Sequence, residues 1–137
     1  MRRLFLLVPM LLLGCRDRDH SAASAVGTLR TVHFANEEYK KRCGEYAASL
    51  YELSYADGHP SCRAMQLIDP TTAEGKKSSY DFRYIPRRNE AGKIIAYEFY
   101  AEPFTRLENP RLFVDQTGVI RVERMGRRAD RNSPPIQ

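Results

Sequence analysis

The spacing of apolar residues changes along this chain from a helical period to a strand period, and this change constrains the fold more than any other feature. Over residues 21–43 the apolar residues recur at steps of three and four, whereas from residue 79 they alternate with polar residues. The first spacing places apolar side chains on one face of a helix, and the second places them on one face of a strand. We therefore expect an α+β fold, in which a long amino-terminal helix packs on an antiparallel β-meander of about four strands.

The long helix is expected to begin at Ser21 and to end at Cys43. The Ser21 hydroxyl can act as the N-cap acceptor, and the basic residues 40–42 suit the negative end of the helix dipole. Gly44 stands where a left-handed C-cap residue is favoured. The side chains expected to pack on the sheet form one apolar stripe: Val26, Leu29, Val32 and Tyr39.

The middle of the chain carries weaker signals. Residues 45–53 predict a second short helix, and the Gly and Pro within residues 56–60 break it. Residues 69–72 and 75–77 have the composition of turns. We therefore expect few regular backbone hydrogen bonds in this region.

Two hairpins are predicted after residue 79. Their four strands are residues 80–84, 95–99, 112–114 and 119–122. A turn over residues 87–92 joins the first pair, and a turn that contains Gly118 joins the second. The short loops favour antiparallel pairing of each strand with the next.

Four tyrosines fall on the first predicted hairpin: Tyr80, Tyr84, Tyr97 and Tyr100. They are either core residues or part of an aromatic binding platform. Because one helix cannot cover both faces of a sheet, we expect some of them on the open face, where exposed aromatic side chains would indicate a partner.

Residues 125–137 are rich in Gly, Arg, Asn, Ser and Pro, and this composition predicts a disordered basic tail. Several arginines gather towards it: Arg121, Arg124, Arg127, Arg128 and Arg131. A solvated chain end is the simpler interpretation of this cluster, and contact with phosphate or with lipid headgroups is the alternative.

The beginning of the chain has the pattern of a bacterial lipoprotein signal. Arg2 and Arg3 form a basic start, residues 4–13 form an apolar run, and residues 12–15 resemble the lipobox. The apolar run is far shorter than the roughly 20 residues that a membrane-spanning helix needs. A signal of the ordinary secretory type is the alternative interpretation.

The lipobox resemblance implies that residues 1–14 are a signal peptide and that Cys15 carries lipid. Residues 15–20 would then form a spacer, and the mature protein would be anchored in a membrane of the bacterial cell envelope, on its periplasmic or extracellular side. Several acyl chains together give stable anchoring, whereas a single chain gives only reversible binding.

The remaining cysteines, Cys43 and Cys62, make an even pair in an oxidising compartment, so we expect a disulfide between them. The bond would close a loop of about 20 residues, which the chain-entropy model rates at about 3 kcal/mol. Two separate buried thiols are the alternative.

The sequence contains no strong catalytic signature. His33 and Glu37 lie one turn apart on the predicted helix and are weak candidates for a metal pair, but catalytic metal sites normally have three protein ligands. We therefore expect no enzymatic activity, no catalytic residue and no cofactor.

The net charge argues against nucleic acid as a partner. Loss of Arg2 and Arg3 with the signal lowers the formal net charge from +5 to about +3, which is too mild a charge to indicate nucleic-acid binding.

The order of elements resembles the globular part of type IV pilins and pseudopilins. Five segments carry the resemblance: residues 22–31, 67–69, 75–82, 100–103 and 113–121. It implies a pilin-like α+β domain over residues 21–124. Pilins also carry a prepilin-peptidase site followed by a long apolar helix, and neither pattern is present here, so a lipid would take the place of that helix as the anchor.

Together these expectations describe a lipid-anchored, pilin-like envelope protein. It would act as a non-enzymatic structural or binding module, through protein contacts in secretion, pilus assembly or adhesion. The alternatives are a small envelope metal-binding protein or hydrolase, and a DNA-binding pilin-like module.

Overall fold

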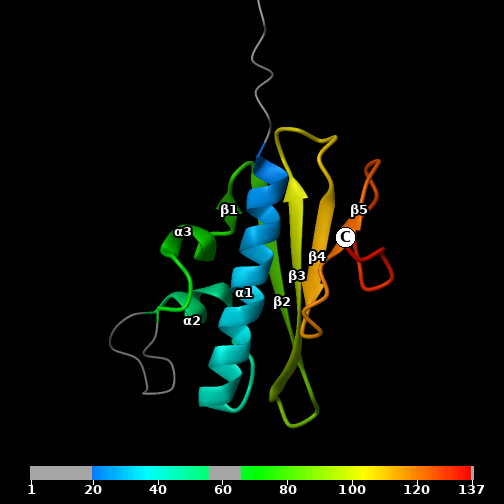
Figure 1. Cartoon of the computed structure of the whole chain (residues 1–137). Helices are drawn as coiled ribbons and strands as arrows, with labels where there is room; N and C mark the ends of the chain where they lie inside the picture. Colours follow the sequence, from blue (N-terminus) through cyan, green and yellow to red (C-terminus); the bar gives the residue numbers. More distant parts are fainter. Residues whose placement is uncertain (1–19, 56–65, 137) are drawn as a thin grey trace, which may run out of the picture.

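The computed structural model describes residues 20–55 and 66–136, and Figure 1 shows how its elements are arranged. Three sequence predictions fall on residues outside the described ones: the expected signal peptide, the expected lipid attachment at Cys15 and the expected disulfide partner Cys62. Within the described part, no helix has the length and apolar character that crossing a bilayer requires.

One antiparallel sheet forms the centre of the structure, and its strands follow one another in chain order from β1 to β5. Their bounds are β1 Lys76–Lys77, β2 Tyr80–Arg88, β3 Ile94–Pro103, β4 Arg111–Asp115 and β5 Arg121–Glu123. The long central pair places Tyr84 opposite Phe99, and Phe99 lies opposite Val114 on the next strand. These three residues therefore share one face of the sheet.

Helix α1, Ser21–Cys43, lies along this face and contacts β3 and β4 (Figure 1). It ends as expected at Gly44, which has a left-handed φ of 79° and donates its N–H to the carbonyl of Lys40. The expected N-cap is wrong. The cap residue is His20, and the Ser21 hydroxyl instead accepts a hydrogen bond from Asn109.

The core lies between α1 and the inner face of the sheet. On the helix, Leu29, Val32 and Tyr39 are buried as expected, whereas Val26 is only partly buried. Aromatic rings of the sheet stack beneath them, with Phe82 against Phe99 at a centroid distance of 5.5 Å. This burial gives α1 the stability that a helix of its length lacks on its own.

The expected fold, a long helix on a four-stranded pilin-like meander, is wrong. The structure is a β-rich fold with one main helix, and its sheet has five strands. The strand that the sequence did not reveal is β1, where Lys76 and Lys77 pair with Asp81 and Tyr80. A strand of two residues is too short to show an alternating pattern, so its pairing partner alone defines it.

The segment before β1 is also more regular than expected. Pro70–Ala73 form the short helix α3, because the Asp69 carboxylate accepts the Thr72 N–H and Pro70 occupies the first turn. The pKa of Asp69 is lowered, mainly by this backbone hydrogen bond.

The second helix is shorter than predicted. Helix α2 spans Leu50–Ser54, with the Ser49 side chain as its N-cap. The residues before it do not continue a helix, because the Tyr46 N–H donates to the carbonyl of Ile94 at the start of β3.

The C-terminal residues 125–136 are not a disordered tail. Figure 1 shows them turning back beside β5, and two backbone bonds hold them there. The Val122 N–H donates to Pro134, and the Ile136 N–H donates to Ile120. The polar composition of residues 125–136 does not predict this pairing, because the pairing depends on the neighbouring strand β5. We name residues 124–136 the C-terminal strap.

Candidate functional site

The face of the sheet that points away from α1 carries polar side chains in two parallel rows. On β2 these include Asp81, Arg83 and Arg87, and on β3 they include Glu98, Tyr100 and Glu102. The strand register sets Asp81 opposite Glu102 and Arg83 opposite Tyr100. The same alternation that turns the core aromatics towards the helix turns these residues outwards. We name this surface the outer face.

Glu98 is the centre of the outer face. It is only 8% exposed, although it is charged. Its Oε2 accepts from Arg87 Nη2 at 2.7 Å and from the Tyr100 hydroxyl at 3.2 Å, and its Oε1 accepts from Arg131 Nη2 at 3.4 Å. A nearly buried carboxylate needs such partners, because burial of an unpaired charge is costly.

Contact with Glu98 also changes the titration of Arg87 and Tyr100. The hydrogen bond to Glu98 raises the pKa of Arg87, so this guanidinium stays charged. Burial and then the charge of Glu98 raise the pKa of the Tyr100 hydroxyl. The group therefore presents protonated donors over the physiological pH range.

The C-terminal strap lies across the outer face. Arg131 reaches Glu98, Arg128 lies 3.6 Å from Glu102, and Arg121 of β5 donates to the Ser133 carbonyl at 2.9 Å. Ala129 and Ser133 of the strap are buried. The strap is thus packed on the sheet and not merely attached to its edge.

Two small depressions open on the outer face. One, of about 150 Å³, is lined by Asp81, Arg83, Tyr100, Glu102 and Arg128. The other, of about 160 Å³, is lined by residues that include Arg87, Glu98, Asp115 and Arg131. Both contain arginines beside carboxylates, so they can accept groups of either charge.

The sequence singled out the strap arginines but not Glu98 or Arg87. The available signal was the acidic residue between Tyr97 and Phe99, in the middle of a strand with aromatic residues on its other face. Such a residue points away from the core, but only the structure shows which arginines meet it.

The structure does not bring His33 and Glu37 to a common point. His33 Nδ1 and the Tyr97 hydroxyl share a hydrogen bond of 2.6 Å, whereas Glu37 Oε1 accepts from the Tyr46 hydroxyl at 3.0 Å. Among the described residues no three His, Cys, Asp or Glu side chains are grouped so that they could hold a metal ion.

Three of the four strand tyrosines lie in the core, and one lies on the outer face. Tyr80 and Tyr97 are fully buried, and Tyr84 donates its hydroxyl to Asn36 and to the Ala47 carbonyl. Tyr100 is the outward residue, with Arg83 4.9 Å above its ring and Phe113 packed edge-on. The tyrosines therefore do not form an open stacking platform.

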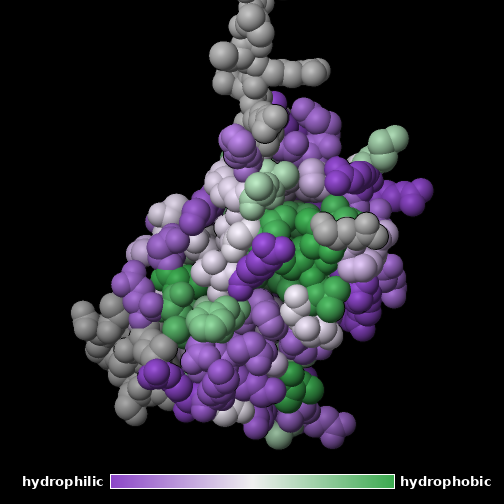
Figure 2. Space-filling model, viewed as in Figure 1, coloured by the Kyte–Doolittle hydropathy of each residue, from purple (hydrophilic) through white to green (hydrophobic). Residues whose placement is uncertain are grey.

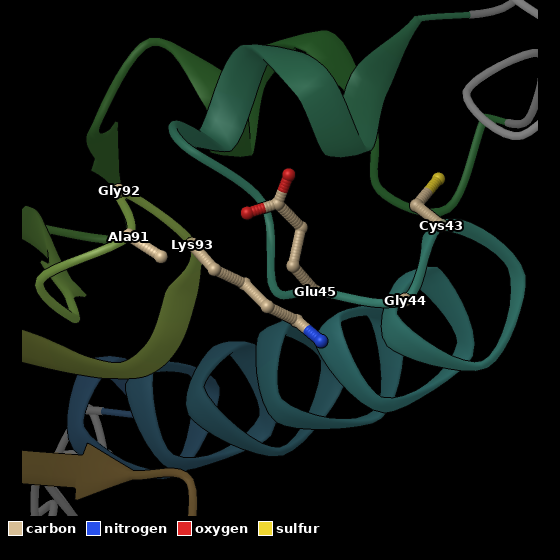
Figure 3. Close-up of a pocket in the computed structure, with 6 residues that line it drawn as sticks. All are labelled: Cys43, Gly44, Glu45, Ala91, Gly92 and Lys93. Carbon is tan, nitrogen blue, oxygen red and sulfur yellow. The ribbon is translucent and has the colours of Figure 1, made fainter.

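A third depression, of about 380 Å³, lies between the end of α1 and the β2–β3 turn (Figure 3). Cys43, Glu45 and Lys93 line it, and the Glu45 carboxylate accepts the Ile94 N–H. Figure 3 shows the Cys43 sulfur pointing away from Lys93. The expected Cys43–Cys62 bond stays a prediction, because Cys62 is outside the described residues.

Comparisons of the chain with protein-family models, with curated proteins and with solved structures found no significant match.

Proposed function

We propose that this chain is a lipid-anchored protein of the bacterial cell envelope that acts without catalysis, by binding a protein partner through the outer face. The lipobox-like residues 12–15 support the anchor. The outer face supports binding, because it gathers side chains that favour protein contacts.

The observation that carries the binding role is the convergence of Arg87 and Arg131 on the nearly buried Glu98. Each guanidinium has five N–H donors in a planar fork, and Glu98 accepts hydrogen bonds from only some of these donors. Glu98 therefore holds two arginines in fixed positions while leaving donors for a partner. This lowers the entropy that ordering those side chains would cost on binding.

The composition of the face fits a protein partner better than a nucleic acid. Arg and Tyr are among the residues most often found at interface hot spots. Here Arg83 lies opposite Tyr100, and Arg87 and Tyr100 both donate to Glu98. The carboxylates Asp81, Glu98 and Glu102 on the same surface would repel a phosphate backbone. A protein surface of mixed charge can face both the arginines and the carboxylates.

The hydrogen bonds of His33 and Glu37 favour this binding role over that of a small metal-binding protein or hydrolase. Both side chains are hydrogen-bonded to tyrosines and hold α1 to the sheet and to the following loop. Their positions therefore have a structural explanation that requires no metal ion.

Photo-crosslinking in the producing cell tests the binding role. Ile85 lies between Arg83 and Arg87 on β2, and replacing it by a photoreactive amino acid places the probe on the outer face. We expect one discrete adduct of defined mass, which the pair Arg83→Glu and Arg87→Glu abolishes.

The matched control places the same probe at Phe34, a residue that is 65% exposed on α1. It should give no adduct of the same mass. An adduct that survives both charge reversals, or that forms equally from Phe34, would refute the outer face as the binding surface.

A further inference from the structure

Several loops meet at the end of the domain where α1 begins (Figure 1). Asn109, in the loop after β3, donates to Ser21 at 3.0 Å, and Ser24 shares a 2.7 Å hydrogen bond with Ser78. The strap leaves β5 at the same level, because Glu123 pairs with Arg111 next to that loop. We name this region the anchor-side end, since the chain leads from it back to Cys15.

Large apolar side chains are exposed on the loops of the anchor-side end. Phe104 is 47% exposed, Leu107 is 62% exposed and Met125 is 95% exposed. They lie on two separate segments, residues 104–110 and the start of the strap. Exposed apolar residues gathered at one end indicate a contact surface.

Basic residues flank these apolar residues in the sequence, and Figure 2 shows hydrophilic residues over much of this end. Lys76 lies with its Nζ 5.7 Å above the ring of Phe104. The other basic residues are Arg106, Arg124 and Arg127, with Glu108 as the acidic residue of the same loop. Apolar side chains among Lys and Arg are typical of surfaces that lie in the interface of an anionic membrane.

The proposed anchor brings this end close to a bilayer. Five residues follow Cys15 before the start of α1, and five extended residues span at most about 18 Å. A domain on so short a tether has its anchor-side end next to the headgroups. The β2–β3 turn lies at the opposite end of the domain (Figure 1), so the anchor would direct it away from the membrane.

We propose that the anchor-side end docks directly onto an anionic phospholipid surface. Leu107 and Met125 insert among the headgroups, and Arg124 and Arg127 contact lipid phosphates. This inference rests on the proposed lipid anchor for its geometry, but the contact itself is made by residues outside the anchor. It fixes the orientation of the domain and keeps the outer face accessible at the side of the molecule.

Vesicle binding of an unlipidated chain tests the docking. All described helices and strands lie within residues 21–123, so the mature chain 15–137 with Cys15→Ser keeps each of them. We expect it to bind vesicles of phosphatidylcholine with phosphatidylglycerol, and to bind phosphatidylcholine alone more weakly. The pair Leu107→Ser and Met125→Ser should lower the partition coefficient about tenfold, the effect of losing about one buried apolar side chain.

The matched control is the pair Phe34→Ser and Tyr51→Ser, because these residues are 65% and 53% exposed but lie elsewhere on the surface. Their replacement should leave vesicle binding unchanged. The pair Arg124→Glu and Arg127→Glu should weaken binding to the anionic vesicles and remove much of its salt dependence.

A fluorescence measurement reports insertion directly. The chain contains no Trp, so Leu107→Trp introduces a single reporter at the anchor-side end. We expect a blue shift on vesicle addition and quenching by lipids that carry a quencher near the headgroup. Tyr51→Trp should show neither change.

The outcomes separate docking from anchoring. If a full-length protein that carries Cys15→Ser together with Leu107→Ser and Met125→Ser stays in the membrane fraction in processed form, the anchor is refuted, while vesicle binding still decides the docking. No vesicle binding, or equal loss in the Phe34 and Tyr51 control, overturns the docking. So does a result in which Leu107→Ser changes protein crosslinks but not vesicle binding, since that would assign this end to a protein partner.

Discussion

The Nδ1 atom of His33 on α1 lies 2.6 Å from the hydroxyl oxygen of Tyr97 on β3. This bond fixes the imidazole ring, and its Nε2 edge then faces the turn between β4 and β5. A Cβ atom on Gly118 of that turn would lie 2.6 Å from Nε2. The helix, the central strand and the last hairpin therefore meet at one histidine.

The contact predicts a specific cost for Gly118→Ala. Gly118 and Gly92 both have a positive φ, of 76° and 80°, but a Cβ on Gly92 would meet no atom within 4 Å. Gly92→Ala should cost about 1–2 kcal/mol, the cost of a left-handed alanine, and Gly118→Ala should cost more. Denaturant melts of both variants measure the difference between the two costs. In a background that carries His33→Ala, this difference should disappear. An equal cost at the two glycines would contradict the contact.

Burial of the α1 stripe predicts that Leu29→Ala is severe. Leu29 is fully buried against the sheet, so the change should cost about 2–5 kcal/mol, a large part of the stability of a small domain. Thr31→Ala is the control, because its exposed hydroxyl bonds only to the Gly27 carbonyl of its own helix. It should shift the free energy of unfolding by less than about 0.5 kcal/mol. The reverse order would mean that the buried face is misassigned.

Glu98 is expected to hold the C-terminal strap through Arg131. Glu98→Gln removes the charge that both arginines contact, so the strap should open more often and trypsin should cleave after Arg127 and Arg131 faster. Glu102→Gln is the control, because its pair with Arg128 is longer and more exposed and should have a smaller effect. Equal cleavage rates in both variants would show that backbone pairing alone holds the strap.

The buried tyrosines predict a loss of stability in alkali. Burial, and then the hydrogen bond to Glu37, raises the pKa of Tyr46 from 10.0 to about 12. Below pH 10 the contribution of protonated Tyr46 to the free energy of unfolding is fully present. Above pH 10 the unfolded chain releases this proton before the folded chain does, so the contribution is lost as the pH rises through about 12. Denaturant midpoints followed over this range should fall, and less steeply in Tyr46→Phe. The same slope in that variant would assign the effect to other tyrosines.

Cys43 and Cys62 are expected to be bonded to each other. Thiol titration of the denatured, unreduced mature chain should detect neither cysteine, because an oxidising compartment favours the disulfide. Two reactive thiols would refute the pair. Loss of only one would indicate a bridge to another molecule.

The sequence alone determined the elements that repeat a local period. It predicted the extent of α1 and its end at Gly44, and the two hairpins whose turns contain Gly92 and Gly118, because helix and strand periods and left-handed glycines are properties of neighbouring residues. It did not predict β1 or α3, since two to four residues are too few to show a period.

Only the tertiary structure decided which residues from distant segments meet. The strap pairs with β5 although its composition is that of a disordered tail, and Arg131 reaches Glu98 across 33 residues of chain. His33 meets Tyr97 across 64 residues. Such pairs depend on the register of the strands and on how α1 lies across them. The physical reason is that a local pattern sets which face a side chain occupies, whereas its partner is set by the packing of the whole chain.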